Sequence, residues 1–252
     1  AMGLDRMIRF LLAFAMVLAG VWRTEAAAQI PVRVGGYEFP PFVETDRDGP
    51  HGLTLRLIAL LNGVQGHYRF EFVPVSARRR YGDLVEGRFD VMFFENPQWE
   101  WRDQGFPVDF TKVFLQGGEV YIALAQPGRG QDYLVGILGY HYGFAGYDAD
   151  PERLARRFDL KLVSSHRSSI EMVLSGRRDM AVVTDAYLNA FLRASPQAGE
   201  RLLISRRMDQ VYEHRVLVRR DGPIDAAVMD RLMTELGQSG RLGDLWREEG
   251  IR

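Results

Sequence analysis

The sequence predicts an α/β fold built as two similar lobes, and a repeated motif is the main reason. Residues 84–94 and residues 174–183 each read as a helix end, a glycine, an Arg-x-Asp turn and an apolar run. Glycine supplies the left-handed backbone of a helix C-cap, and an apolar run is typical of a strand buried on both faces. Helices and strands alternate along the remaining chain, which favours mostly parallel sheets flanked by helices.

The first 28 residues are expected to be a secretory signal peptide. Arg6 and Arg9 precede an apolar run over residues 10–21, and alanines 26–28 come just before Gln29. This order of basic, apolar and small residues is that of a cleavable export signal, and about twelve apolar residues are short for a membrane span. We therefore expect a mature chain that begins near Gln29 in a periplasm, without stable membrane insertion after cleavage. An uncleaved anchor helix is the alternative.

Composition excludes several classes of function. The 252-residue chain has no cysteine and a formal net charge of −1. It therefore has no disulfide framework, no lipid-attachment cysteine and no thiolate chemistry, and its charge does not favour nucleic acid as a partner. Its five histidines are scattered without metal-ligand spacing, and no Gly-x-Ser-x-Gly motif occurs. We predict no metal and no cofactor.

The elements expected first follow from the patterns of apolar residues. Leucine and isoleucine at helical spacing predict a helix over residues 53–61, which Gly63 or Gly66 ends. Pro40 and Pro41 present the neighbouring rings on a stiff extended turn. The expected order is strand 32–35, aromatic loop 36–42, helix 53–61, strand 68–73, helix 77–86, strand 91–94, loop 95–107 and strand 119–125.

A proline- and glycine-rich linker at residues 126–130 separates these elements from a second set. Asp150 as N-cap with Pro151 at the first helical position predicts the start of one helix. A Ser168-x-x-Glu171 capping box predicts the start of another. The expected order is strand 134–138, glycine-rich loop 139–147, helix 151–158, strand 160–163, helix 169–175, the second apolar strand, helix 186–193, strand 214–219, and helices 223–237 and 240–248.

From Val32 onward the chain resembles the bacterial extracellular solute-binding proteins of family 3, the polar amino-acid type. The resemblance rests on Arg33-Val-Gly, Phe39-Pro-Pro-Phe42, Gly87-Arg-Phe-Asp90, Ser175-Gly-Arg-Arg-Asp179, Thr184-Asp185 and Gly240-Arg-Leu-Gly-Asp-Leu-Trp246. It implies the type II periplasmic-binding-protein fold, a ligand cleft between the lobes and hinge closure. Lobe 1 would comprise residues 29–120 and 212–252, and lobe 2 would comprise residues 121–211.

The resemblance also implies ligand contacts in lobe 1. Phe39, with Tyr37 beside it, occupies the place of an aromatic ring that stacks on the ligand; ordinary packing is the alternative. Arg102 stands at the distance from Asp90 at which family members clamp the ligand carboxylate, and a guanidinium suits that partner. The usual Ser/Thr-rich approach is replaced by residues 95–101, so a solvated surface arginine is the alternative.

In lobe 2 the resemblance places the acceptor of the ligand ammonium at Asp185 or Thr184, and either residue also suits a helix N-cap. Counted from Asp90 and Asp179, Glu95 aligns with Thr184, and Asn96 aligns with Asp185 across the expected cleft.

Glu95 departs from the family pattern, because a carboxylate would repel a substrate carboxylate in a water-poor cleft. Either the ligand is cationic or rich in donors, or Glu95 pairs with a nearby arginine, or Glu95 points away. Arg78, Arg79 and Arg80 begin the preceding helix, and one of them can supply that pairing. Arg79 is the expected ligand contact, since its spacing is similar to that of an arginine in related subfamilies; a solvated basic turn is the alternative.

Aromatic and glycine-rich loops complete the expected site. Trp99 and Trp101 are two residues apart, so on an extended loop both would face one way and help form an aromatic pocket for an apolar or cationic group. Pinning the loop onto lobe 1 is the alternative. The glycines of loop 139–147 let backbone amides approach a solute carboxylate. His141 in that loop is a candidate proton donor if the protein is an enzyme, and otherwise a loop histidine.

We therefore predict a monomeric periplasmic solute-binding protein, not an enzyme, that captures a small polar solute such as an amino acid or a related amine or carboxylate. The resemblance implies delivery to an ABC transporter permease. One alternative is a periplasmic accessory protein of the same fold that docks on a protein partner. A dehydratase-like enzyme on this fold is a further alternative, since the expected cleft carries carboxylates.

Overall fold

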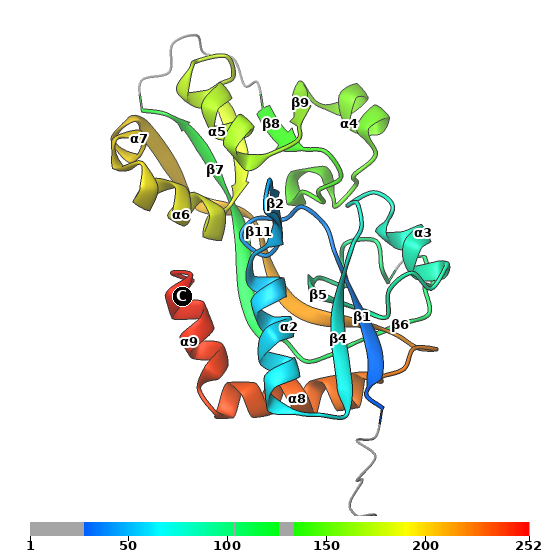
Figure 1. The fold of residues 1–252 in the computed structure, drawn as a ribbon. Coiled ribbons are helices and arrows are strands. Elements are labelled where there is room, and N and C mark those ends of the chain that lie inside the picture. The colour runs from blue at the N-terminus through cyan, green and yellow to red at the C-terminus, as the bar shows by residue number, and fades with distance from the viewer. Residues whose placement is uncertain (1–27, 103, 126–133, 252) are drawn as a thin grey trace, which may run out of the picture.

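The computed structural model describes residues 28–102, 104–125 and 134–251, and it shows two lobes joined by two long strands (Figure 1). The predicted signal peptide, up to residue 27, and the predicted linker at 126–130 lie outside the described residues. Within the part that is described, no helix is long and apolar enough to cross a membrane.

One lobe, lower in Figure 1, is built from both ends of the chain. Its elements are β1 (Ile30–Gly36), β2 (Glu44–Asp46), β3 (Gly49–His51), α2 (Leu53–Val64), β4 (Tyr68–Pro74), α3 (Arg80–Val85), β5 (Val91–Glu95), β6 (Val108–Phe110), α8 (Ala226–Gln238) and α9 (Arg241–Glu248). The β2–β3 hairpin and β6 were not predicted, because three-residue strands show little periodicity. Helix α2 ends at Val64 with Gln65 as its C-cap, so of the two glycines predicted to end it, Gly66 follows the helix and Gly63 lies inside it.

The other lobe contains β8 (Leu134–Ile137), the 3-10 turn η1 (Gly143–Ala145), α4 (Pro151–Arg157), β9 (Leu160–Val163), α5 (His166–Leu174), β10 (Met180–Thr184), α6 (Asp185–Ala194) and α7 (Pro196–Arg201). The predicted cap of α4 is confirmed, since the Asp150 side chain accepts from the Arg153 amide. The predicted start of α5 is wrong. Ser165 caps this helix by accepting from the Ser168 amide, so Ser168 lies in the first turn.

Strands β7 (Leu115–Leu124) and β11 (Leu202–Arg219) run antiparallel to each other through both lobes. The strand order is β4-β1-β5-β11-β7-β10-β8-β9, with parallel pairs at both ends and these two strands in the middle. The sequence predicted only residues 214–219 of β11. Register shifts around Met208 interrupt its alternation, which explains why the first part was missed. The predicted lobe boundaries, at 120/121 and 211/212, fall inside β7 and β11 and remain predictions.

The repeated motif has the predicted local form, and its first aspartate has a structural role. Gly87 and Gly176 both have left-handed backbones, with φ of 67° and 68°. The Asp90 carboxylate accepts from the Arg33 backbone amide at 2.9 Å, from the Arg33 guanidinium and from Arg219 Nη2 at 2.7 Å. Although partial burial opposes it, these donors lower the pKa of Asp90. The motif thus ties β1, β5 and β11 together.

Candidate functional site

The centre of the space between the lobes is filled by aromatic rings. Phe39 follows β1 in the first lobe, and its ring lies 5.8 Å from that of Trp99 and 5.4 Å from that of Tyr140, which follows β8 in the other lobe. The rings of Tyr212 and His214, both on β11, lie 6.5 Å and 6.1 Å from Phe39. Aromatic packing therefore joins the two lobes through β11, which together with β7 forms the pair of strands that run through both lobes, here called the crossing strands.

A small central cavity of about 10 Å³ remains among these rings. Such a volume holds about one water molecule. The central cavity is lined from both lobes and from β7, by Tyr37, Phe39, Arg80, Trp99, Glu119, Gly139, Tyr140 and His141.

Arg80 and Glu95 form a fully buried ion pair on the lobe 1 side of the central cavity. Arg80 Nε lies 3.6 Å from Glu95 Oε2, and the guanidinium stacks over the rings of Tyr37 and Tyr81 at 4.7 Å and 4.6 Å. Trp101 Nε1 donates to the same Glu95 oxygen. Burial raises the pKa of Glu95, and Arg80 opposes that rise. Of the three interpretations of Glu95, the structure agrees with pairing to a nearby arginine, which is Arg80.

A second buried carboxyl, Glu119 on β7, lines the central cavity. Gln210 on β11 donates from Nε2 to Glu119 Oε2 at 2.7 Å and also to the His141 carbonyl. Trp99 Nε1 donates to Gln210 Oε1 at 3.3 Å. Burial raises the pKa of Glu119 well above its ordinary value. This network connects one residue of each lobe to both crossing strands.

His141, the candidate proton donor of the enzyme hypothesis, has both ring nitrogens next to internal partners. Nδ1 lies 2.7 Å from the Tyr147 carbonyl oxygen, and Nε2 lies 2.9 Å from the Tyr81 hydroxyl. Burial lowers the pKa of His141 to about 3, so the imidazole is neutral at neutral pH.

The glycine-rich loop binds an anion, but that anion is a side chain of the protein. The amides of Gly143 and Phe144 donate to the Asp209 carboxylate at 2.6 Å and 2.9 Å, and the Tyr121 hydroxyl donates to it as well. The interpretation of these two amides as a site for a solute carboxylate is therefore wrong. Asp209 stands in the part of β11 that the sequence did not predict.

Thr184 and Asp185 point to different surroundings. Thr184 is buried, and its hydroxyl lies 2.9 Å from His166 Nε2. Asp185 begins α6, and its carboxylate accepts from the Ala186 amide at 2.6 Å. Burial raises the pKa of Asp185.

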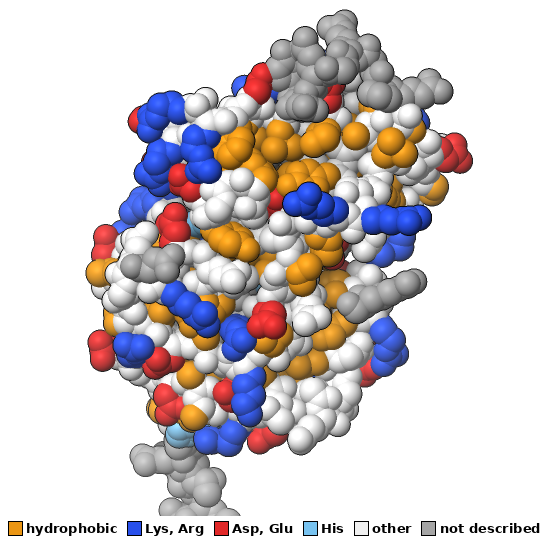
Figure 2. All heavy atoms as spheres, turned by 180° about the vertical axis from the view of Figure 1, so that it is seen from behind, with side chains coloured by type: hydrophobic (Ala, Val, Ile, Leu, Met, Phe, Trp, Pro, Cys, Tyr) orange, Lys and Arg blue, Asp and Glu red, His pale blue; other side chains and the backbone are white. Residues whose placement is uncertain are grey.

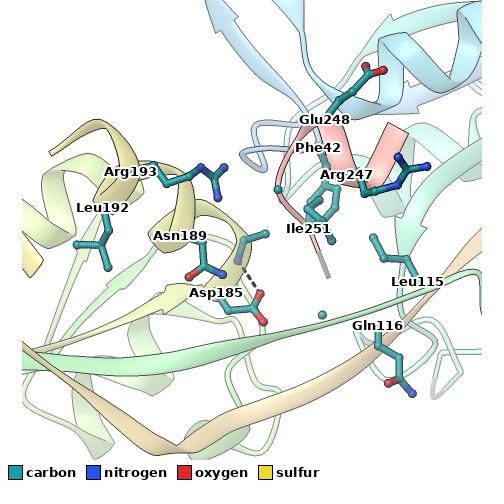
Figure 3. Close-up of a pocket in the computed structure, with 13 residues that line it drawn as sticks. Phe42, Leu115, Gln116, Asp185, Asn189, Leu192, Arg193, Arg247, Glu248 and Ile251 are labelled. Atoms are coloured by element: carbon teal, nitrogen blue, oxygen red, sulfur yellow. Dashed lines mark hydrogen bonds between the residues drawn. The ribbon is translucent and has the colours of Figure 1, made fainter. Parts of the chain in front are cut away.

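Asp185 faces a cavity of about 870 Å³, here called the α6–α9 hollow, which lies beside β7 between α6 and α9 (Figure 3). The hollow is lined by polar and apolar side chains alike: Phe42, Leu115, Gln116, Asp185, Asn189, Leu192, Arg193, Arg247, Glu248 and Ile251, among others. The hollow borders both lobes, as the central cavity does, and is much larger.

The remaining predicted site residues are scattered. Arg79 is exposed, and its guanidinium lies 3.9 Å from Asp83. Exposed Arg102 and buried Asn96 line a separate pocket of about 350 Å³, away from the central cavity. The expectation that Trp99 and Trp101 face one way is wrong, because Glu100 between them has a left-handed backbone with φ of 64°. Trp99 faces the central cavity, and Trp101 packs on Tyr81.

Arg80, Glu119 and Gln210 were missed as site residues. Glu119 had a visible signal, since it is the one charged residue in the predicted strand over residues 119–125. Nothing in the sequence distinguishes Arg80 from its neighbours Arg78 and Arg79. Among the described residues, no group of three or more histidine or acidic side chains is arranged to hold a metal ion.

Comparison with solved structures identifies the fold. A binding component of an ABC transporter from Wolinella succinogenes DSM 1740, complexed with lysine, is 17% identical with a TM-score of 0.65 over 88% of this chain and 96% of that chain. An ABC uptake transporter substrate-binding protein from Streptococcus pneumoniae with bound histidine is 15% identical with a TM-score of 0.67, over 86% and 91%. An ancestral amino-acid-binding protein, described as a precursor of cyclohexadienyl dehydratase, is 16% identical with a TM-score of 0.63, over 86% and 94%.

The chain therefore has the two-lobed type II periplasmic-binding-protein fold, which confirms the predicted fold class. No family model matches the chain, and no curated protein sequence matches it.

Proposed function

We propose that this chain is a periplasmic solute-binding protein of the polar amino-acid type, which closes on a small polar solute between its lobes and delivers it to an ABC permease. The fold supports this function, since structures that share it bind lysine and histidine. We propose that the protein acts as a monomer and does not transform its solute.

One observation carries the proposal: residues of both lobes line a cavity that strand β7 also borders. Tyr37 and Phe39 come from one lobe, Tyr140 and His141 from the other, and Glu119 from β7. A hinge rotation about β7 and β11 changes the distance between the cavity walls that the two lobes supply, and each lobe keeps its own packing. The α6–α9 hollow, with Asp185 at its side, is a second cavity that residues of both lobes line.

A thermal-shift screen of amino acids, amines and small carboxylates tests the proposal, followed by calorimetry on each hit. A specific solute raises the unfolding temperature by mass action, by an amount that grows with its concentration over Kd. Recovery of an altered product from a stabilising compound would instead support the dehydratase-like alternative. Stabilisation by no compound in the screen would contradict solute binding.

One observation favours a second candidate function, that of an accessory protein docking on a periplasmic partner. The central cavity has room for about one water molecule, and β11 exposes Leu203, Ile204 and Val211. Figure 2 shows hydrophobic side chains gathered on the upper lobe, on the face behind that of Figure 1. An exposed apolar patch is typical of a protein-binding surface. Co-purification of one periplasmic protein, lost in Leu203→Asp but retained in Glu171→Ala, would support this function over solute capture.

A further inference from the structure

Glu119 is buried without a cationic partner among the described residues. Its side chain is 2% exposed, and its hydrogen-bond donor is the neutral amide of Gln210. The charged groups that face it, Asp185 and Asp209, are acidic and raise its pKa further, in addition to burial. The phenols of Tyr140, Tyr142 and Tyr212 also surround it. A buried carboxyl that lacks a counter-charge is costly unless something else pairs with it.

The charges around the central cavity do not balance when Glu119 is ionised. Arg80 is already paired with Glu95, and the two are fully buried together. Among the side chains that line the cavity, ionised Glu119 is then a negative charge without a positive partner, and one bound cation neutralises it. An anionic solute would instead be repelled by this carboxylate, and the repulsion is strong because the buried surroundings have a low dielectric constant.

The walls and the size of the central cavity also favour a small cation. Phe39, Trp99 and Tyr140 surround it with aromatic rings, whose faces attract positive charge. Its volume of about 10 Å³ matches one water molecule, and an ammonium group is of similar size. Gly139 and His141 also line a neighbouring pocket of about 190 Å³ between α3 and α4, which offers room for the remainder of a solute when the lobes part.

We propose that Glu119 is the counter-charge for the primary ammonium group of a small solute bound in the central cavity. This inference rests on the proposed function and names the solute class of the same cleft. The ammonium takes the position opposite Gln210 on the Glu119 carboxylate, and the three aromatic rings enclose it.

The test uses three probes with the same carbon chain and different charges: butylamine, 1-butanol and butyrate, at pH 7. The indole signal of Trp99 in a ¹⁵N–¹H spectrum reports on the cavity, since this Nε1 donates to Gln210. With four tryptophans in the chain, Trp99→Phe assigns that signal. We expect butylamine to shift it saturably, with 1-butanol and butyrate binding at least about tenfold more weakly.

Glu119→Gln is the matched variant, because glutamine keeps the size and the oxygen that accepts from Gln210. It should lose at least about tenfold in affinity for butylamine, while Glu213→Gln, an exposed change on β11, should retain wild-type affinity. If Glu119→Gln does not fold, the charge series on the unaltered chain decides alone. Equal binding of 1-butanol, an unchanged affinity in Glu119→Gln, or no saturable shift with butylamine would each overturn the inference.

These outcomes separate the inference from the proposed function. An amino acid or carboxylate that stabilises wild type and Glu119→Gln equally would leave solute binding in place and remove the role of Glu119. Failure of every compound in the thermal-shift screen would contradict both.

Discussion

At the scale of single residues, the most informative feature is a set of buried charges. Glu95 and Arg80 sit together in an aromatic surrounding, and Glu119 stands nearby with a neutral partner. Removal of one partner of a buried pair leaves an uncompensated charge, which costs far more than loss of the pair as a whole. Substitutions at these side chains are therefore expected to change stability as well as the proposed solute binding.

Arg80→Met should lower the free energy of unfolding by about 3–5 kcal/mol, because it leaves Glu95 buried without its cation. The double variant Arg80→Met/Glu95→Gln should recover part of that loss. Arg79→Met is the matched control, since Arg79 is exposed and should change stability by no more than about 0.5 kcal/mol. Urea unfolding measures all three. An Arg80→Met loss as small as that of Arg79→Met would contradict the pairing.

The buried histidines predict a loss of stability in mild acid. Burial lowers the pKa of His166 from 6.5 to about 3. Between these values the unfolded chain binds a proton that the folded chain does not, so stability falls as pH decreases below 6.5. Buried Glu95 and Glu119, whose pKa values are raised, act in the opposite direction.

Comparing the wild-type protein with His166→Gln separates the effect of His166 on the pH dependence of stability from that of the two carboxyl groups. Between pH 6 and pH 5, the variant should lose less stability than wild type by up to about 1.4 kcal/mol per pH unit. Free energies of unfolding measured at both pH values check this. If the free energy of unfolding changes equally with pH in both proteins, folding does not lower the pKa of His166.

At the scale of elements, a carboxylate from one crossing strand shapes a loop of lobe 2. The Asp209 side chain on β11 accepts hydrogen bonds from both amides of the turn that begins at Gly143, and a Cβ on Gly143 would clash with the Asp209 carbonyl oxygen. The strand and the turn thus approach too closely for any side chain at this position. Loop 139–147 is consequently part of the scaffold of the cleft wall.

Asp209→Ala should lower the free energy of unfolding by about 2 kcal/mol or more, because two partly buried amides and the Tyr121 hydroxyl lose their carboxylate acceptor. Hydrogen exchange should accelerate at the amides of Gly143 and Phe144 well beyond the rest of lobe 2. Asp221→Ala, a change in an exposed turn, serves as the control. Unaltered exchange at these two amides would show that Asp209 does not hold the loop.

At the scale of the whole molecule, the lobes meet at the α6–α9 hollow as well as at the aromatic centre. Arg193 of α6 donates from Nη2 to the Glu249 carbonyl at 3.0 Å, at the C-terminal end of α9. A cation at a helix C-terminus is favourable, typically by about 0.3–1 kcal/mol. A contact of this size can hold the lobes together and still release them when a solute enters.

Arg193→Gln should therefore shift the lobes toward wider separation, by about two- to fivefold in population. Spin labels on Asn189→Cys and Arg247→Cys measure it across the hollow, in a chain that has no native cysteine. A stabilising solute should narrow the distance distribution of the unaltered chain. Superimposable distributions for Arg193→Gln and for the unaltered residue would show that this contact does not restrain closure.

Much of the fold was predictable because it depends on local patterns. The cap of α4 at Asp150 and the left-handed glycines of the repeated motif depend on neighbouring residues alone. The candidate site was predictable in part: Tyr37, Phe39, Trp99 and His141 do line one cavity. The other predicted contacts lie elsewhere, because spacing along the chain does not specify which way a loop turns at a position such as Glu100.

The sequence by itself determined the order of most helices and strands, the two-lobed α/β class and the repeated turn, since capping residues and apolar runs act over a few neighbouring positions. Only the tertiary structure decided which of three consecutive arginines is buried, and that its partner is Glu95. It also decided that Asp209 satisfies the glycine-rich loop and that aromatic rings fill the centre. These outcomes depend on β7 and β11 bringing distant segments together, and burial then selects the charges that must be paired.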